Sequence, residues 1–205
     1  MIIAQISDTH LALDVPDARQ RIVDFERVIA DINTLEPAPD VIVHTGDVVQ
    51  NGRQKEYAEA IRILSAARAP VYAMVGNKDN RKNLYSAFAP DLYYGTDSEF
   101  IEYVVEDYPV RLLVLDTLNL ASNKGEFSPV RARHLIEMID ADKSRPIAVC
   151  THHPPFEVQV GPDAVHFQTR KMMDELSEAI LYSDRVVAVF SGHVHRGTVG
   201  RVGKI

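Results

Sequence analysis

The sequence predicts a layered α/β fold. Its 205 residues contain six short runs rich in Val, Ile or Leu, and segments with helical periodicity lie between several of them. Apolar runs without clean alternation indicate strands that are buried on both faces. A recurring order of strand, helix and strand indicates helices packed against a sheet that is largely parallel. We therefore expect a single α/β domain over residues 1–205.

The predicted elements follow one another along the whole chain. The strands are expected at Ile2–Ile6, Val41–Val43, Val71–Val75, Val110–Leu115, Ile147–Cys150 and Val186–Phe190. Apolar residues three or four positions apart predict four helices between or after these runs. The helical positions are Ile22, Phe25, Ile29 and Ile32; Tyr57, Ile61 and Leu64; Leu135, Met138 and Ile139; and Met172, Leu176 and Ile180.

Local signals add detail to this order. Ser128 and Pro129 are residue types preferred at the N-cap and first position of a helix, so we expect the third helix to begin there. Phe100–Val105 and Val110–Leu115 are separated by a short turn that contains proline, which predicts an antiparallel pair. The irregular stretch Pro154–Phe167 is expected to form a loop over the functional site.

Composition and charge exclude several classes of protein. Hydrophobic residues make up 46% and charged residues 25%, which is typical of globular proteins and excludes disordered or collagen-like chains. The lone Cys150 lies in an apolar run and fits a reducing compartment. The N-terminus shows no signal-peptide pattern and no stretch of bilayer length, so we expect a cytoplasmic location. With a net charge of −7 and no basic stripe, neither long nucleic acid nor membrane is an expected partner.

Polar clusters stand directly behind five of the apolar runs. They are Asp8-Thr9-His10, Gly46-Asp47, Gly76-Asn77, His152-His153 and Gly192-His193-Val194-His195. Ligands of α/β sheets collect beyond the carboxyl ends of the strands, so we expect these side chains to converge. Carboxylate, amide and imidazole groups bind borderline divalent metals, and the inventory suits two ions better than one. Asp47 is the carboxylate expected to bridge the two ions.

These clusters resemble the signature of the calcineurin-like metallophosphoesterases. That signature reads Asp-x-His, Gly-Asp, Gly-Asn-His-Asp/Glu, a His near Pro, and Gly-His-x-His, and the match runs in order over nearly the whole chain. The resemblance implies a four-layer αββα sandwich with mixed central sheets and two divalent ions of Fe, Mn, Zn or Co. It implies as metal ligands Asp8, His10, Asp47 and His195 for one ion, and Asp47, Asn77, His152 and His193 for the other.

The resemblance also implies an activity, which is hydrolysis of a phosphate ester by a hydroxide that bridges the ions. The Asp47–Gly52 sequence and the His152–Pro155 run look most like bacterial class III cyclic nucleotide phosphodiesterases and glycerophosphodiesterases. A small phosphodiester is therefore the expected substrate. The alternatives are a phosphomonoesterase, a dinucleotide polyphosphate hydrolase, a DNA-repair nuclease, and a binding scaffold of the same fold with weak catalysis.

One residue departs from the signature. Lys78 follows Asn77 at the position where the family usually has a His credited with stabilising the transition state or protonating the leaving group. A lysine side chain, with an ordinary pKa of about 10.4, carries a positive charge that can neutralise charge developing at neutral pH. We therefore expect Lys78 to act in catalysis together with Asn77 and Asp47.

Other polar residues near the clusters receive individual predictions. Substrate contacts are expected from Asn77, Lys78, His153 and His166. The other interpretations are support of a metal ligand for His153 and simple solvent exposure for His166. The remaining predictions are a core or ligand-supporting His44, a surface His134, a turn or helix cap at Asp79, a structural Asp116, and solvated Arg81 and Lys82.

The C-terminal end predicts an open sheet edge. Only Arg196–Ile205 follows the last expected ligand, whereas members of the family usually continue with strands of the second sheet. We expect the second sheet to be incomplete at the C-terminus. An unpaired edge can be covered by a second subunit, which makes a homodimer an expected assembly.

Overall fold

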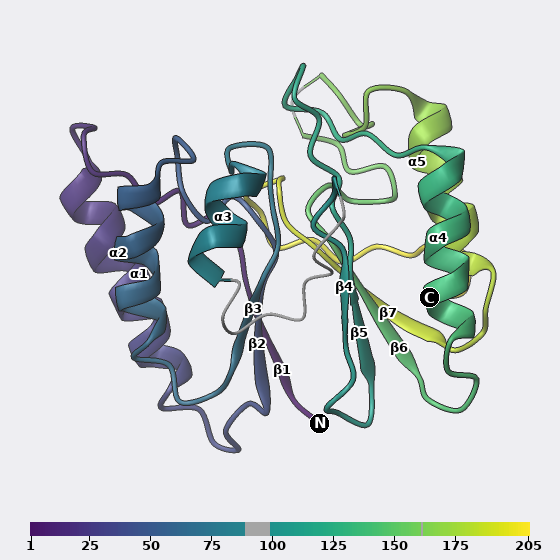
Figure 1. Cartoon of the computed structure of the whole chain (residues 1–205), viewed down its shortest axis with the longest axis horizontal. Coiled ribbons are helices and arrows are strands. Elements are labelled where there is room, and N and C mark those ends of the chain that lie inside the picture. Colours follow the sequence, from purple (N-terminus) through teal and green to yellow (C-terminus); the bar gives the residue numbers. More distant parts are fainter. Residues whose placement is uncertain (89–98, 161) are drawn as a thin grey trace.

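The computed structural model describes residues 1–88, 99–160 and 162–205, which form two sheets packed face to face (Figure 1). The first sheet has the order β1-β2-β3 and is parallel throughout. The second has the order β4-β5-β6-β7, in which β4 and β5 are antiparallel and the other pairs are parallel. The strands are β1 (Ile3–Ile6), β2 (Val41–His44), β3 (Val71–Ala73), β4 (Tyr103–Val105), β5 (Arg111–Val114), β6 (Ile147–Thr151) and β7 (Val186–Ser191).

Helices cover the outer face of each sheet. The first sheet is covered by α1 (Ala18–Ile32), α2 (Gln54–Leu64) and α3 (Arg81–Phe88), and the second by α4 (Pro129–Asp140) and α5 (Arg170–Leu181). The layers therefore run helix, sheet, sheet, helix, as the family resemblance implies. The antiparallel pair in the second sheet confirms the mixed sheet and the predicted hairpin.

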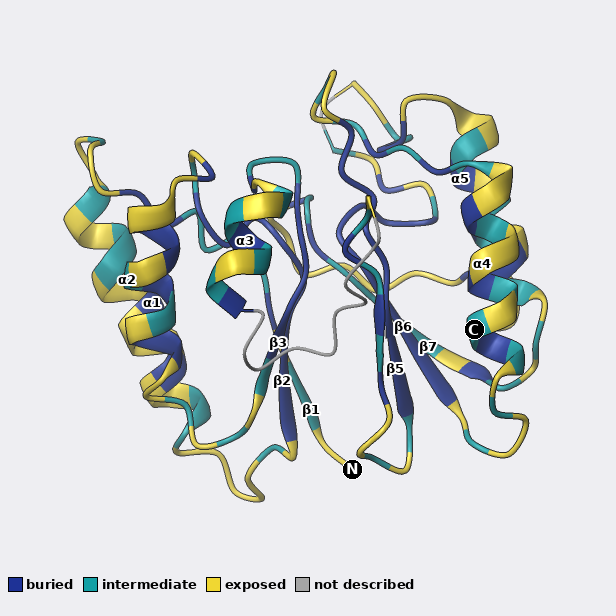
Figure 2. Ribbon diagram, viewed as in Figure 1, coloured by how far each residue is buried: buried dark blue, intermediate teal, exposed yellow. Residues whose placement is uncertain are grey.

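The central strands are buried on both faces, which explains their uninterrupted apolar sequences (Figure 2). In β5, Leu112 and Val114 pack with residues of the first sheet, whereas Leu113 packs with Leu135 of α4 and Leu176 of α5. β5 thus contributes to two cores, one between the sheets and one beneath α4 and α5. Among the described residues, no helix combines the length and apolarity needed to cross a membrane.

The helix start predicted at Ser128 and Pro129 was correct. The Ser128 side chain accepts a hydrogen bond from the Arg131 backbone N–H, and Pro129 occupies the first turn of α4. Thr169 caps α5 in the same way. By contrast, no periodic apolar pattern predicted α3, which has eight residues and buries only Leu84 and Phe88.

The two sheets meet along β1 and β7. Gln5 in β1 donates from Nε2 to Thr45 Oγ1 and to the backbone oxygen of Ser191 in β7, at 3.1 and 2.8 Å. Within the described residues, β7 is the outermost strand of the second sheet, and Val187 on it is 55% exposed.

Candidate metal centre

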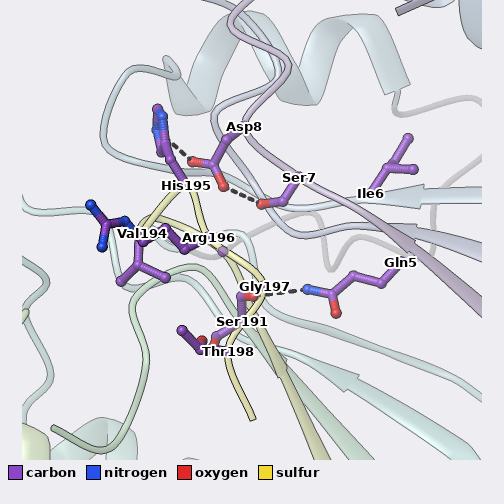
Figure 3. A pocket seen from close by; sticks show the side chains of 11 residues that line it. Gln5, Ile6, Ser7, Asp8, Ser191, Val194, His195, Arg196, Gly197 and Thr198 are labelled. Carbon is purple, nitrogen blue, oxygen red and sulfur yellow. Dashed lines mark hydrogen bonds and ion pairs between the residues drawn. The ribbon is translucent and has the colours of Figure 1, made fainter. Parts of the chain in front are cut away.

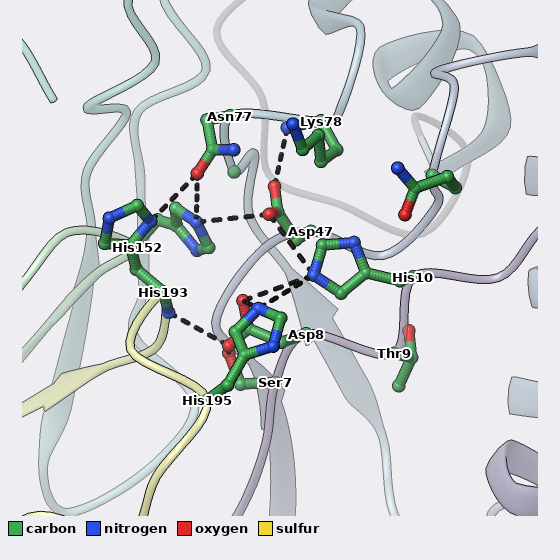
Figure 4. A network of polar contacts seen from close by, with 12 residues as sticks. Ser7, Asp8, Thr9, His10, Asp47, Asn77, Lys78, His152, His193 and His195 are labelled. Atoms are coloured by element: carbon green, nitrogen blue, oxygen red, sulfur yellow. Dashed lines mark hydrogen bonds and ion pairs between the residues drawn. The ribbon is translucent and has the colours of Figure 1, made fainter. Parts of the chain in front are cut away.

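The seven predicted metal ligands converge where the carboxyl ends of both sheets meet (Figure 4). The first sheet contributes the side chains that follow β1, β2 and β3, and the second sheet contributes those that follow β6 and β7. In three overlapping groups of side chains, which include His153 beside six of these ligands, the potential ligand atoms of each group lie within 4.8 Å of one another. The groups are Asp8, His10 and His195; Asp8, Asp47 and His152; and His152, His153 and His193.

We call Asp8, His10, Asp47 and His195 the first half-site. His10 Nε2 lies 3.0 Å from His195 Nε2 and 3.5 Å from Asp47 Oδ2. Asp8 Oδ1 lies 3.4 Å from His195 Nε2 and 3.8 Å from His10 Nε2. Two atoms bound to one ion at about 2.0–2.2 Å are themselves about 2.8–3.6 Å apart in tetrahedral or octahedral geometry. The observed spacings fall within this range or just beyond it.

We call Asp47, Asn77, His152 and His193 the second half-site. Asn77 Oδ1 lies 3.0 Å from His152 Nε2 and 2.9 Å from His193 Nδ1. Asp47 Oδ2, which faces His10 in the first half-site, is also 3.6 Å from His152 Nε2. One carboxylate oxygen therefore borders both half-sites, as expected of a bridging ligand.

The hydrogen-bond chemistry of the second half-site fits a bound cation. His152 Nδ1 is 2.8 Å from the Thr45 carbonyl oxygen, which can only accept, so Nδ1 carries the ring proton. In the neutral ring, Nε2 then directs a lone pair at Asn77 Oδ1, another acceptor, and the two repel unless a cation lies between them. Burial lowers the pKa of His193 to about 3, helped by nearby His152. That ring is therefore neutral, as metal binding requires.

The contacts of Asp8 indicate that the first half-site also fits a bound cation. Its Oδ2 accepts hydrogen bonds from Ser7 Oγ at 2.6 Å and from the His193 backbone N–H at 2.9 Å. Its Oδ1 is buried and has no hydrogen-bond partner among the described residues. A buried carboxylate oxygen without a partner is costly, and a cation would satisfy it. The residues of both half-sites thus fit divalent metal.

Backbone strain is concentrated in the ligand turns. Among the described residues other than glycine, those with positive φ are five of the seven predicted ligands, with φ between 43° and 71°. They are Asp8, His10, Asp47, His193 and His195. Asp and His tolerate this left-handed region better than most residues, but it still carries strain that clusters at functional sites. These five residues lie in turns that follow the strands, and the positive φ values direct their side chains toward the cluster.

Glycines before the ligands are required by close packing. A Cβ atom on Gly76 would collide with the backbone nitrogen and Oδ1 of Asp47. A Cβ atom on Gly192 would collide with Ser7 Oγ and would lie 2.8 Å from Asp8 Oδ2. The glycines in the two motifs therefore let the turns of different strands approach each other.

Asp79 connects the turns after β2 and β3. Its buried carboxylate accepts from the backbone N–H groups of Gly76, Val48 and Val49 and from the Tyr57 hydroxyl. This role is broader than the predicted cap of one turn. Burial, with the negative Asp47 nearby, raises the pKa of Asp79 to about 7.

Lys78 lies at the rim of the second half-site. Its backbone N–H donates to Asp47 Oδ1 at 2.6 Å, and its Nζ donates to Asn123 Oδ1 at 3.1 Å. Asn77 Nδ2 donates to the same Asn123 oxygen at 3.4 Å. Sequence reasoning missed Asn123, because its only signal is a place in a polar, irregular segment behind β5.

His153 and His166, predicted as substrate contacts, lie inside the protein. His153 is fully buried, with Nδ1 at 2.8 Å from Thr117 Oγ1 and Nε2 at 3.1 Å from the Asn123 carbonyl oxygen. His166 is 8% exposed, and its Nε2 is 2.9 Å from the Val158 carbonyl oxygen. The predicted loop at 154–167 contains His166, and its residue 161 lies outside the described residues. Burial favours support of the site over contact with substrate for both rings.

The solvent-exposed position predicted for Arg81 was wrong. Arg81 was expected on a solvated face, but its guanidinium donates to both oxygens of the buried Asp116, at 2.6 and 3.0 Å. This pair also confirms a structural role for Asp116. His134 is exposed and lies 3.1 Å from Glu102, as its surface assignment predicted.

The two half-sites differ in their access to solvent. A cavity of about 470 Å³, lined in part by Asp8, Ser191, His195 and Arg196, opens between the ends of β1 and β7 (Figure 3). The His195 side chain is 58% exposed, whereas that of His152 is fully buried. The first half-site is therefore open on the side of β7.

An αββα sandwich with carboxylate, amide and imidazole groups gathered at its strand ends defines the class of metal-dependent phosphoesterases. The chain belongs to the calcineurin-like phosphoesterase family, whose model matches residues 1–197.

Several curated proteins with similar sequences are named phosphodiesterases. The chain is 30% identical over 204 residues to the probable glycerophosphodiester phosphodiesterase GpdQ of Arcobacter nitrofigilis, covering 96% of this chain and 72% of that protein. It is 28% identical over 210 residues to the glycerophosphodiester phosphodiesterase GpdQ of Enterobacter lignolyticus, covering 97% and 72%. It is 25% identical over 200 residues to the 3′,5′-cyclic adenosine monophosphate phosphodiesterase CpdA of Pseudomonas aeruginosa, covering 96% and 70%.

Solved structures share the fold. A dimetal phosphatase from Danio rerio superposes with a TM-score of 0.63 at 14% identity, covering 94% of this chain and 81% of that one. The purple acid phosphatase PPD1 from yellow lupin seeds gives a TM-score of 0.55 at 14% identity, covering 94% and 37%. At these identities the likeness concerns the fold alone.

Proposed function

We propose that this protein hydrolyses a small phosphodiester with two divalent metal ions held in the two half-sites. The observation that carries the proposal is the meeting of His152 Nε2 and Asn77 Oδ1 at 3.0 Å, a spacing that fits two ligands of one cation. The names of the relatives support the diester: two are glycerophosphodiester phosphodiesterases and one acts on a cyclic nucleotide. The proposed substrate is therefore of the glycerophosphodiester or cyclic nucleotide type.

The charge of the ligand set favours an anionic substrate. Of the seven proposed ligands, only Asp8 and Asp47 are carboxylates, and the others are a neutral amide and imidazoles. Two divalent ions, when bound, supply net positive charge for the phosphate oxygens and lower the pKa of a shared water so that hydroxide can attack. Asp47 lies between the half-sites and fixes their spacing through Oδ2.

Lys78 is the proposed group for the leaving oxygen. Its ammonium lies beside Asn77 at the rim of the second half-site, where it can neutralise negative charge that develops as the ester bond breaks. A residue with this role matters most for a poor leaving group, because more charge develops on the departing oxygen.

Lys78→Ala tests that role. We expect the variant to lose about 100-fold in kcat with alkyl diesters, a loss typical for removal of one charge-stabilising group, and less with nitrophenyl diesters. Steady-state kinetics on both substrates measures the difference. Wild-type rates on both would show that Lys78 has no part in the reaction.

The proposal as a whole is tested by metal removal and reconstitution. Protein treated with a chelator is reloaded separately with Mn²⁺, Fe²⁺, Zn²⁺ or Co²⁺, and its metal content is measured. Turnover is then followed with bis(p-nitrophenyl) phosphate, cyclic nucleotides, glycerophosphodiesters and a phosphomonoester. We expect two ions per chain and faster turnover of a diester than of the monoester. Absence of turnover with every metal would contradict an enzymatic function, and preference for the monoester would contradict the proposed substrate.

A further inference from the structure

The contacts of Asn123 assign this residue a role that rests on the proposed function. We propose that Asn123 is a positioning residue that orients the Asn77 amide toward the second half-site and holds the Lys78 ammonium at its rim. One side-chain oxygen, Asn123 Oδ1, accepts from both Asn77 Nδ2 and Lys78 Nζ, at 3.4 and 3.1 Å. This single atom therefore links the proposed metal ligand with the proposed charge-stabilising group.

The first effect concerns the direction of the Asn77 amide. Its oxygen can face His152 and His193 only while its NH₂ group points away from them. Asn123 Oδ1 accepts from that NH₂ group, and a flipped amide would instead place two oxygens against each other. Asn123 thus favours the orientation that presents Asn77 Oδ1 to a metal ion.

The second effect concerns the freedom of Lys78. A lysine side chain has many rotamers, and fixing it costs conformational entropy at the moment when substrate must be bound. The bond to Asn123 Oδ1 holds Nζ beside Asn77 before substrate arrives. Charge that is positioned in advance stabilises a transition state without further reorganisation.

Asn123 is held in turn by the buried His153. The Asn123 carbonyl oxygen can only accept, so His153 Nε2 carries the ring proton and donates to it at 3.1 Å. His153 Nδ1 is then the acceptor for the Thr117 hydroxyl at 2.8 Å. The backbone at residue 123 is thereby fixed, although the Asn123 side chain is exposed.

A pair of substitutions separates hydrogen bonding from shape. Asn123→Leu keeps a similar volume without an acceptor, whereas Asn123→Asp keeps an oxygen that accepts from both Asn77 and Lys78. The control is Asn119→Ala on the same segment, because its amide donates to Ser122 and Gln168 and touches neither half-site. Calorimetric titration of chelated protein with Mn²⁺ and steady-state kinetics on a diester are measured for all variants and for wild type.

The expected result is selective. Loss of a group that orients a metal ligand costs about 10- to 100-fold in affinity or activity, so Asn123→Leu should weaken one of two Mn²⁺ sites and lower kcat by that factor. Asn123→Asp should recover most of the Mn²⁺ affinity. In a Lys78→Met background, Asn123→Leu should lower kcat by a smaller factor than in wild type, because part of its effect acts through Lys78.

Several outcomes would overturn the assignment. Equal Mn²⁺ binding by wild type and Asn123→Leu would do so, as would an equal loss in Asn119→Ala, which would indicate loosening of the segment. Wild-type protein that binds two ions but turns over no ester would contradict the proposed function instead, and the binding comparison would still decide the role of Asn123.

Discussion

The two half-sites hold their ligands in different ways. All four residues of the first half-site have positive φ, so the bent backbone itself directs each side chain inward. In the second half-site only Asp47 and His193 have positive φ, whereas hydrogen bonds to Asn123 and to the Thr45 carbonyl direct Asn77 and His152. The first arrangement forms whenever the turns form. The second also depends on residues supplied by other segments.

This difference predicts which ligands respond when a neighbouring side chain is replaced. A ligand held by backbone strain changes only if the turn changes, and the turns are packed tightly around glycines. A ligand held by side chains changes when one supporting residue is replaced. Lys78, where this chain departs from the family signature, lies beside the second half-site.

The most damaging substitution should be at the residue that belongs to both half-sites. Asp47→Asn keeps the shape of the side chain but removes the charge that both ions would share. We expect kcat to fall by more than about 100-fold, the upper range for residues that only support ligands, and Mn²⁺ binding to weaken at both sites. Calorimetry and steady-state kinetics measure this. Asp184→Asn, an exposed change at the opposite end of β7 from the cluster, is the control. Loss of only one ion would show that Asp47 does not bridge.

Gly76 tests the packing that lets the turns approach. Gly76→Ala would force a methyl group against Asp47, and a backbone contact of this kind cannot be relieved by a flexible side chain. We expect the free energy of unfolding to fall by about 1–3 kcal/mol, toward the upper end, and both half-sites to weaken. Urea denaturation of chelated protein gives the first quantity.

Gly197→Ala is the matched control for this change, because a Cβ atom there meets nothing within 4 Å. It should alter stability by less than about 0.5 kcal/mol. If Gly76→Ala were equally harmless, close packing would not explain the glycine.

The sequence was informative where chemistry and position coincide. Short polar clusters after apolar strands predicted the convergence of Asp8, Asp47 and Asn77, because parallel strands place their ends together. It was uninformative where contacts join distant loops. Asn123 has no periodicity or motif, and its role depends on residues about 45 positions away in the chain. Arg81 was misassigned for the same reason, since its partner Asp116 lies in the segment that follows β5 of the second sheet.

The smallest expected effect concerns the turn that carries Asp8 and His10. Thr9, between them, donates from Oγ1 to the Val48 carbonyl oxygen at 2.8 Å. Because that hydroxyl has one proton, His44 Nε2, 2.9 Å away, must be a donor to Thr9. His44, which burial keeps neutral by lowering its pKa to about 3, therefore helps to hold the turn. This contact places it in the ligand-supporting role that the sequence predicted.

Thr9→Val removes the hydroxyl while keeping the side-chain shape. The buried N–H of His44 then loses its partner, so we expect the free energy of unfolding to fall by about 1 kcal/mol, with exposed Thr198→Val as the unaffected control. Since the turn backbone remains, Mn²⁺ affinity should drop less than in Asn123→Leu. The loss of Mn²⁺ affinity should be confined to the first half-site. An Asn77→Ala background, which removes a ligand of the second half-site, allows the first to be titrated alone. In a His10→Ala background, which removes a ligand of the first half-site, Thr9→Val should leave Mn²⁺ affinity unchanged. An equal loss of affinity there would mean that the two half-sites are not held independently.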